Sequence, residues 1–352
     1  MNQSPAPEAE DPKWSRGALE VLSSCPACGA QDACWDTRRV DDAGAMPDIW
    51  HIYRCSACGS IYLNPRPNVE SLPAAYVDYL THDAPEAERA LASQEWMWAV
   101  LRDYLASRFG LRTPLRVLPG GRVLFQLFEP WRLKLDRFGR HLTRSRFVRP
   151  GRLLDVGCGA GEFLALAKAM GWSASGCDPD PKVVEMCIAR GLDVRLGGGD
   201  AFADALGSFD VVTLNQVIEH VIDPQALLRQ CQALLRPGGM VWIGFPNPRS
   251  IGFMQFGAAW AGLHPPYHLC LPTQAVLDRW LVSAGFERVH FERRGMHARA
   301  DWQKSVAIAR QLGLVIPRPW FRWLSRCFSD FVSTLTPRWS EETVAVAWKA
   351  AP

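Results

Sequence analysis

The residues best suited to chemistry are gathered in LLDVGCGAGEFL, residues 153–164. Gly157, Gly159 and Gly161 follow an apolar run that ends near Asp155, a pattern that predicts a strand turning into a helix. Glycines let the backbone approach a ligand because no Cβ atom intervenes. A dinucleotide site would instead read G-x-G-x-x-G and aim a helix N-terminus at pyrophosphate, which Asp155 and Glu162 would repel. These acids favour a ligand that carries an ammonium or sulfonium group.

The segment resembles motif I of the class I S-adenosylmethionine-dependent methyltransferases, and the resemblance extends from about Gly151 to Pro248 with two closing strands near the C-terminus. It implies that S-adenosylmethionine is the cofactor and that the glycine turn and Asp155 hold its methionine part. Asp178, which ends the second strand in SGCDPDP, would accept hydrogen bonds from both ribose hydroxyls. The same resemblance implies adenine contacts from Asp200 and from Ala201 or Phe202 in LGGGDAFAD, and methionine contacts from Asn215 and Gln216 after the fourth strand.

The elements that must position these residues alternate regularly after residue 150. RLLDVG, ASGCD, DVRLG, FDVVTL and MVWIGF are strand-like and are separated by helical stretches, which predicts an α/β fold with a parallel sheet covered on both faces. The resemblance implies the Rossmann-like, seven-stranded class I sheet. We expect a disordered tail (1–20), a zinc-ribbon module (21–70), a helical connector or cap (71–150), the cofactor-binding core (151–294), a basic aromatic helical insertion (295–340), and a closing strand with the C-terminus (341–352).

Two C-x-x-C pairs predict a metal site near the N-terminus. Cys25 and Cys28, and then Cys55 and Cys58, supply four thiolates with the spacing of a structural zinc ribbon. A site closed by four thiolates leaves no position for catalysis, so the zinc would stabilise a module too small for its own core. A ribbon before a methyltransferase core resembles bacterial methyltransferases with an N-terminal zinc-binding domain, often associated with sugar, polysaccharide or natural-product biosynthesis.

Methyl transfer to a hydroxyl requires a base, and histidine is the usual one near neutral pH. His268, in the segment HPPYHL after the fifth strand, is the first candidate for base or substrate contact, and His220, in IEHV after the fourth strand, is the second. The competing interpretation is that either histidine is a hydrogen-bonded core residue with no part in catalysis. No further cluster of carboxylates in the sequence indicates a catalytic metal.

Composition places the chain among globular proteins. Of 352 residues, 48% are hydrophobic and 21% are charged, no stretch is long and apolar enough to span a membrane, and the first residues lack the apolar core of a signal peptide. We therefore expect a cytoplasmic protein. The eleven cysteines are then expected to stay reduced.

Positive charge is concentrated in two stretches. Residues 102–152 carry thirteen Lys and Arg against three acids, and residues 291–327 carry eight against two. Arginine interleaved with Phe, Leu and Trp predicts either peripheral contact with anionic lipid headgroups at the inner membrane face or a helical cap with solvated arginines. The acidic remainder of the chain disfavours a nucleic-acid partner.

The sequence thus favours a methyltransferase that acts on a hydroxyl of a saccharide-containing, lipid-linked or natural-product biosynthetic intermediate. The alternatives are an RNA methyltransferase with a zinc ribbon, a sugar C-methyltransferase, and a binding module that keeps the fold without turnover. The C-methyltransferases carry a longer C-terminal domain than this chain. Fold alone does not separate these alternatives.

Overall fold

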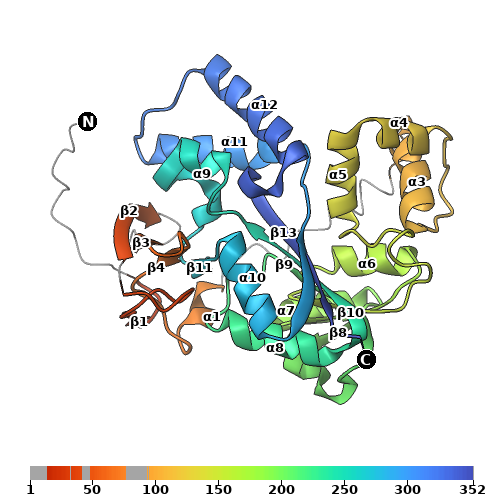
Figure 1. Cartoon of the computed structure of the whole chain (residues 1–352), viewed down its shortest axis with the longest axis horizontal. Coiled ribbons are helices and arrows are strands. Elements are labelled where there is room, and N and C mark those ends of the chain that lie inside the picture. Colours follow the sequence, from red (N-terminus) through yellow and green to blue (C-terminus); the bar gives the residue numbers. More distant parts are fainter. Residues whose placement is uncertain (1–13, 32, 42–47, 77–92, 94, 352) are drawn as a thin grey trace.

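The computed structural model describes residues 14–31, 33–41, 48–76, 93 and 95–351. Its centre is a seven-stranded sheet with the order β12-β13-β10-β9-β6-β7-β8 (Figure 1). Only β13 runs antiparallel to its neighbours in this sheet, and it is inserted between β10 and β12. The strands are β6 (Arg152–Val156), β7 (Ser173–Asp178), β8 (Asp193–Leu196), β9 (Phe209–Asn215), β10 (Leu235–Pro246), β12 (Phe286–Phe291) and β13 (Glu342–Lys349). The expected α/β fold with a mainly parallel, seven-stranded sheet is confirmed.

Both faces of the sheet are covered, as the apolar strands predict. Leu153 and Val211 point to the face covered by α3, α6 and α7, whereas Leu154 and Val212 point to the face covered by α8 and α10. Successive strand residues alternate between faces, so each strand contributes to both cores. The covering helices are α3 (Trp96–Phe109), α6 (Glu162–Ala169), α7 (Pro181–Ala189), α8 (Pro224–Leu234) and α10 (Gln274–Ser283).

Aspartate-proline pairs begin the two helices that follow site strands. Asp180 accepts a hydrogen bond from the Lys182 amide at 2.9 Å and starts α7, while Asp223 accepts one from the Ala226 amide at 2.8 Å and starts α8. A side-chain cap satisfies an amide that the first turn leaves unpaired, and proline suits the first helical position. These starts fix where the loops after β7 and β9 end.

The N-terminal module shares a sheet with the cofactor-binding core. Strands β2 (Ala33–Asp41), β3 (Asp48–Cys55) and β4 (Ile61–Leu63) are joined by β11 (Cys270–Leu271), which comes from the core. Part of the expected tail is folded: the Trp14 ring packs 5.9 Å from Trp50, and β1 (Leu19–Glu20) pairs with β5 (Arg66–Pro67). The rest of that tail, residues 1–13, lies outside the described residues.

The described part of the connector is helical and is broken near its prolines. It contains α1 (Leu72–Ala75), α3, α4 (Gly121–Leu127) and α5 (Glu129–Phe138). Arg108 on α3 pairs with Asp136 on α5 at 2.7 Å, and the Tyr104 hydroxyl donates to the same carboxylate at 3.1 Å. These contacts hold the end of α5 against the core.

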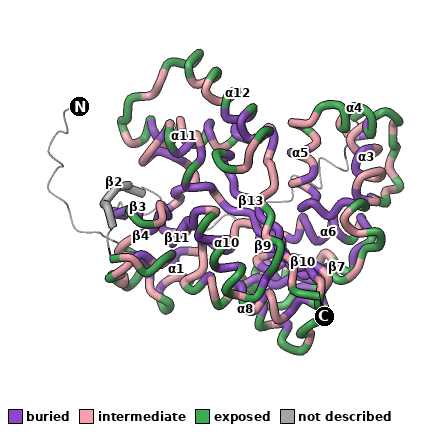
Figure 2. The backbone as a smooth tube through the Cα atoms, viewed as in Figure 1, coloured by how far each residue is buried: buried purple, intermediate pink, exposed green. Residues whose placement is uncertain are grey.

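The insertion forms two helices, α11 (Ala298–Gln311) and α12 (Pro319–Leu335), which pack near α9 (Ile251–Phe256). Short 3-10 turns occupy Gly199–Ala205, Gly257–Ala259, Ala261–Leu263 and Pro337–Trp339. Figure 2 shows exposed residues along α12 and buried ones along the central strands. No helix within the described ranges combines the length and the apolar character that crossing a membrane requires.

Candidate active site

The glycine turn after β6 depends on glycine at each of its three positions. Gly157, Gly159 and Gly161 have φ values of 69°, 50° and 76°, in the left-handed region that other residues rarely adopt. A Cβ atom at Gly157 would lie 2.6 Å from Val217, and one at Gly161 would lie 2.4 Å from Leu192. At Gly159 a Cβ atom would meet no heavy atom within 4 Å, so this backbone borders open space that a ligand can fill.

Asp178 is positioned at the end of β7, where the sequence places it. Its carboxylate accepts hydrogen bonds from the amides of Gly159 (2.9 Å) and Asp180 (3.0 Å), and it lines the cavity beside the turn. Burial raises the pKa of Asp178, while these two amide donors oppose that rise. Each carboxylate oxygen can accept more than one hydrogen bond, so Asp178 can still accept hydroxyl donors.

Asp155 lies deeper than the sequence suggested. It is fully buried at the end of β6, where its Oδ1 accepts hydrogen bonds from Arg140 and from the Thr213 hydroxyl (2.8 Å). Arg140 itself lines the cavity, with its guanidinium 3.6 Å from the centre of the Phe163 ring. The Arg140 guanidinium therefore lies between Asp155 and the cavity. The expected direct contact of Asp155 with a cationic ligand does not fit this arrangement.

Arg140 was not singled out from the sequence, because its role depends on a turn that only the fold reveals. Gly139 ends α5 and lies against the Phe109 ring, and Arg140 and His141 then adopt φ values of 45° and 56°. The Trp242 indole N–H donates to His141 Nδ1 at 3.0 Å, and burial lowers the pKa of His141 to about 4. The neutral, hydrogen-bonded His141 thus fixes the turn that places Arg140 at the cavity.

Asn215 and Gln216 line the cavity at the end of β9, as expected. The Asn215 side-chain oxygen accepts from Arg137 at 2.7 Å, and the Gln216 side-chain amide donates to Glu342 at 3.2 Å. Burial favours the neutral form of Glu342, but the Arg137 and Arg294 guanidinium groups outweigh it and hold the pKa of Glu342 well below its usual range. Glu342 begins β13, so the last strand helps to fix the end of β9.

The segment after β8 differs from the expectation. Gly197 and Gly198 line the cavity, whereas Asp200 is exposed and Ala201 packs partly against the core. Neither Asp200 nor Ala201 belongs to the described cavity wall. The cavity wall is formed three residues closer to the N-terminus than expected, and the extra glycines of LGGGD kept the sequence pattern from fixing this register.

The two candidate histidines lie together but at different depths. His220 lines the cavity, and His268 lies next to it with ring centres 4.8 Å apart and 7% of its surface exposed. His220 Nδ1 is 2.9 Å from the Tyr76 hydroxyl, and His268 Nδ1 is 2.7 Å from the Gly262 carbonyl oxygen. Burial lowers the pKa of His220 to about 3, so its imidazole is neutral near pH 7. The geometry places His220, rather than His268, at the cavity.

A buried carboxylate accompanies these histidines. Glu219 is 0% exposed, and its Oε1 lies 3.9 Å from His220 Nε2 and 4.0 Å from His268 Nε2. Neither carboxylate oxygen has a hydrogen-bond partner among the described atoms. Burial raises the pKa of Glu219 to about 8, so it is largely protonated at pH 7. The three ligating atoms lie within 4.8 Å of one another, close enough to share a proton or a cation.

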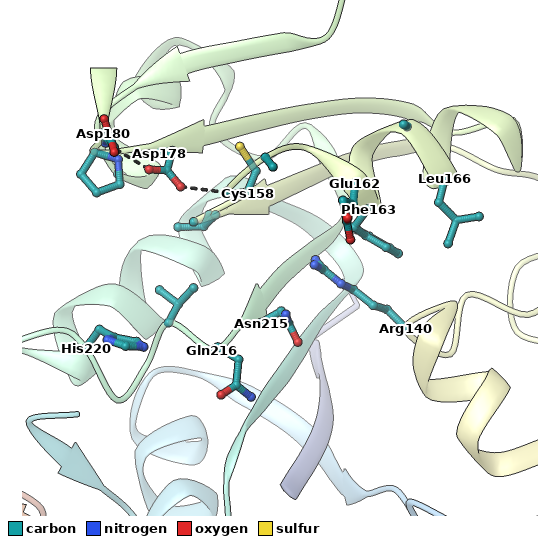
Figure 3. Close-up of a pocket in the computed structure, with 18 of the residues that line it drawn as sticks. Arg140, Cys158, Glu162, Phe163, Leu166, Asp178, Asp180, Asn215, Gln216 and His220 are labelled. Atoms are coloured by element: carbon teal, nitrogen blue, oxygen red, sulfur yellow. Dashed lines mark hydrogen bonds between the residues drawn. The ribbon is translucent and has the colours of Figure 1, made fainter. Parts of the chain in front are cut away.

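The cavity formed by these residues has a volume of about 1400 Å³. Figure 3 shows Asp178 on one side of it, Arg140 near α6, and Asn215, Gln216 and His220 across from Asp178. S-adenosylmethionine fits this donor set: the open backbone at Gly159 leaves room for it, Asp178 can accept ribose hydroxyl donors, and Arg140 presents a cation to a carboxylate.

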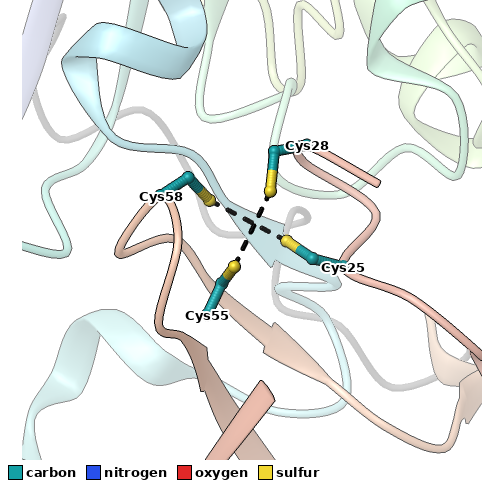
Figure 4. A group of neighbouring side chains, drawn as sticks. All are labelled: Cys25, Cys28, Cys55 and Cys58. Atoms are coloured by element: carbon teal, nitrogen blue, oxygen red, sulfur yellow. Dashed lines mark hydrogen bonds between the residues drawn. The ribbon is translucent and has the colours of Figure 1, made fainter. Parts of the chain in front are cut away.

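The four cysteines meet, as their spacing predicts (Figure 4). Sγ atoms are 3.9 Å apart for Cys25 and Cys58 and 3.6 Å apart for Cys28 and Cys55, close to the roughly 3.8 Å edge of a tetrahedron with Zn–S bonds of about 2.3 Å. Burial raises the pKa of Cys55, but the amides of Cys58 and Ala57 outweigh this and lower it to about 7. The cluster is compatible with a structural zinc ion.

The zinc module is attached to the loop that carries His268. Besides the β4–β11 pairing, the Trp280 indole N–H donates to the Ala27 carbonyl at 3.1 Å, and the Thr273 hydroxyl donates to the Cys58 carbonyl at 3.1 Å. Because β11 begins two residues after His268, the cysteine knuckles help to position the histidine pair.

A family model described as "Methyltransferase domain" matches residues 119–290. Named relatives include the ubiquinone biosynthesis O-methyltransferase of Parvibaculum lavamentivorans, 38% identical over 34% of this chain and 52% of its own length. That of Chelativorans sp. is 29% identical over 58% of this chain and 81% of its own length. The chain thus spans about half the length of several curated relatives that it matches.

Solved structures with a similar fold include an S-adenosylmethionine-dependent methyltransferase from Archaeoglobus fulgidus, with 20% identity, a TM-score of 0.43, and coverage of 64% of this chain and 94% of that one. The 1,6-didemethyltoxoflavin-N1-methyltransferase of Burkholderia thailandensis has 17% identity and a TM-score of 0.40, and covers 89% and 99%. The family model thus identifies a methyltransferase domain over residues 119–290, about half of this chain, and the strand order is the one expected for the class I fold.

Proposed function

We propose that this protein transfers the methyl group of S-adenosylmethionine to a hydroxyl oxygen of a small biosynthetic intermediate. The observation that carries the proposal is one cavity that brings together the glycine turn, Asp178 and His220. The O-methyltransferase names of its relatives support oxygen as the acceptor atom. We further propose that the acceptor contains a saccharide or is lipid-linked, since apolar Val69, Leu72 and Leu115 line the same cavity as the polar groups.

The bound cofactor supplies an electrophilic methyl group on a positively charged sulfur. The glycine turn and Asp178 position it, with Asp178 accepting hydrogen bonds from the ribose hydroxyls. Arg140 neutralises Asp155 and is available to the carboxylate of the methionine part. Such positioning accelerates transfer because an in-line displacement requires the reacting atoms to be held close and aligned.

His220 is the proposed base. As the methyl group bonds to the acceptor oxygen, that oxygen loses its proton to the neutral imidazole of His220. The imidazolium formed would lie 3.9 Å from the Glu219 carboxyl group. His268 is a positioning residue, held by the Gly262 carbonyl and packed against His220.

Equilibrium binding of S-adenosylmethionine tests the cofactor site. Asp178→Ala removes the hydroxyl acceptor and should weaken binding by about tenfold or more, since hydrogen bonds to charged groups contribute roughly 1.5–3 kcal/mol. Glu185→Ala is the matched control, because it removes an exposed carboxylate from α7 away from the cavity wall. Equal affinities for the two variants, or no binding by the unaltered protein, would refute the site.

A further inference from the structure

The outer side of α12 exposes a continuous set of large apolar side chains. Seven of them are between 44% and 61% exposed: Trp320, Phe321, Trp323, Leu324, Phe328, Phe331 and Leu335. We call this set the α12 face. The opposite side of the helix buries Ser329, Val332 and Ser333 against the protein. Exposed apolar patches of this extent on a monomer usually mark an interaction surface.

A groove of about 540 Å³ lies beside the α12 face, between α11 and α12. Four arginines line it together with two tryptophans: Arg299, Arg310, Arg322, Arg326, Trp302 and Trp323. We call it the arginine groove. Of these arginines, only Arg326 has a carboxylate within ion-pair distance in the described parts of the chain, Asp330 at 3.4 Å. The groove therefore presents several uncompensated cations next to exposed apolar rings.

The positive charge of this region indicates which partner binds the α12 face and the arginine groove. Residues 298–327 contain six Lys and Arg and a single acid, Asp301. A second copy of the chain that packed face to face would oppose the same arginines, which like-charge repulsion disfavours. A bilayer with anionic headgroups offers phosphates to the arginines and an acyl boundary to the rings, the two environments that an interfacial helix needs.

We propose that α12 lies in the headgroup region of an anionic membrane, with the α12 face against the acyl boundary and the arginine groove around lipid phosphates. The inference is independent of which acceptor the enzyme methylates. It differs from a transmembrane anchor, because α12 would lie along the surface.

The surroundings of α12 support a fixed docking surface. Asp330 caps α11 by accepting from the amides of His297 (2.8 Å) and Ala298 (3.0 Å), so both helices form one unit. Below them, buried Glu341 accepts from the Trp302 indole at 2.9 Å and the Ser329 hydroxyl at 3.1 Å. These buried bonds tie the unit to the start of β13.

A second apolar set lies on the neighbouring connector. Leu127, Phe128 and Trp131, at the junction of α4 and α5, are 81%, 45% and 42% exposed, and α5 contacts α12. In Figure 1, α4 and α12 both lie along the upper edge of the molecule. Because α5 contacts α12, the two apolar sets lie on neighbouring helices, which fits an extended membrane surface better than a single small ligand.

The test is co-sedimentation of the full chain with vesicles of phosphatidylglycerol and phosphatidylcholine, compared with vesicles of phosphatidylcholine alone. We expect binding to the anionic vesicles that falls as salt is raised. Arg310→Gln with Arg322→Gln should weaken it by at least tenfold, since each arginine near the surface contributes about fivefold. Trp320→Ser with Trp323→Ser should also weaken it.

Matched controls alter the same residue types elsewhere. Arg229→Gln with Arg279→Gln changes exposed arginines on α8 and α10, and Ile188→Ser with Val282→Ser changes exposed apolar residues on α7 and α10. Both pairs should bind vesicles as the unaltered chain does. Cofactor affinity, measured in every variant, should not change, which separates a failure of this inference from a failure of the enzyme.

Three results would overturn the proposal. The first is equal binding to neutral and anionic vesicles, or none to either. The second is unaltered vesicle binding by the tryptophan and arginine pairs. The third is a dimer in vesicle-free solution that Trp320→Ser with Trp323→Ser dissociates, which would assign the α12 face to a second copy of the chain.

Discussion

Arg140, Asn215 and Asp178, which line the cavity, each have a hydrogen-bond partner from another part of the chain that fixes the direction of the side chain. Arg140 neutralises Asp155, Arg137 holds Asn215, and the amide of Gly159 holds Asp178. The site is therefore largely arranged before a ligand enters. Preorganisation of this kind favours catalysis, because little reorganisation is needed during the reaction.

Gly157→Ala should weaken S-adenosylmethionine binding by at least tenfold. The added Cβ atom would lie 2.6 Å from Val217 and would occupy a φ of 69°, so the turn must shift. Gly191→Ala is the control, because its φ of 72° imposes similar strain and its Cβ atom would meet nothing within 4 Å. Titration of the cofactor into both variants measures the difference, and equal affinities would mean that the turn does not hold the cofactor.

His220→Ala should lower kcat by about a hundredfold or more, the usual contribution of a general base, while cofactor affinity stays unchanged. His290→Ala, which alters a largely exposed histidine on β12, should leave turnover as it is. His268→Ala should have a smaller effect, because His268 acts through its neighbour. Steady-state kinetics measures kcat for the three variants. Full activity of the His220 variant would show that His220 is not the base.

Glu219 predicts a pH dependence of stability. Burial raises its pKa from 4.5 to about 8, so the folded protein holds this proton more tightly than the unfolded chain does. The contribution to stability is fully present below pH 4.5 and is lost as pH rises through about 8. Glu219→Gln keeps the shape without the proton and should flatten this part of the curve. Denaturant unfolding between pH 6 and pH 9 measures the slope, and identical slopes would contradict the assignment.

At the scale of elements, the cysteine-bearing module and the loop of His268 meet in one four-stranded sheet. Strand β11 pairs with β4, and the Ala27 and Cys58 carbonyls accept hydrogen bonds from α10 and the residue before it. The ribbon therefore supports the loop of His268, whereas the cofactor turn belongs to β6 and β7. This separation makes the contribution of the metal measurable.

Removal of zinc should lower turnover more than cofactor affinity. Cys25→Ser with Cys28→Ser removes two thiolates, so the knuckles and β11 should lose their order while the glycine turn remains. Cys327→Ser, on α12, is the control because this cysteine lies outside the cluster. Zinc content, cofactor titration and turnover should be measured together. A zinc-free double variant with normal turnover would show that the ribbon does not support the catalytic loop.

The elements with local signals could be predicted from the sequence, and the long-range contacts could not. The turn is predicted by the spacing of Gly157, Gly159 and Gly161. The metal cluster is predicted by the spacing of the paired cysteines. The pairing of Asp155 with Arg140 depends on a left-handed turn after α5, and the role of Glu342 depends on β13 entering beside β10. Neither of these long-range contacts produces a pattern in the neighbouring sequence. Gly197 and Gly198 line the cavity in place of Asp200 and Ala201, and the sequence did not predict this because three consecutive glycines permit several backbone paths.

At the scale of the whole molecule, the distribution of charge matches the two proposed functions, methyl transfer in the cavity and membrane binding at α11 and α12. The cavity combines acids, arginines and apolar walls suited to a small substrate, while uncompensated arginines gather on α11 and α12 at the surface. Nucleic acid remains a less favoured partner, because the sequence outside the two basic stretches is acidic overall.

The most direct test of the proposed O-methyltransferase function is transfer of labelled methyl from S-adenosylmethionine into extracts of the source cells. The extracts are then separated into organic, small aqueous and nucleic-acid fractions. We expect label in the organic or saccharide-containing fraction with the unaltered protein, and a large loss of label with Asp178→Ala and with His220→Ala. Label in RNA would contradict the proposed acceptor, and transfer that survives both substitutions would contradict the proposed site.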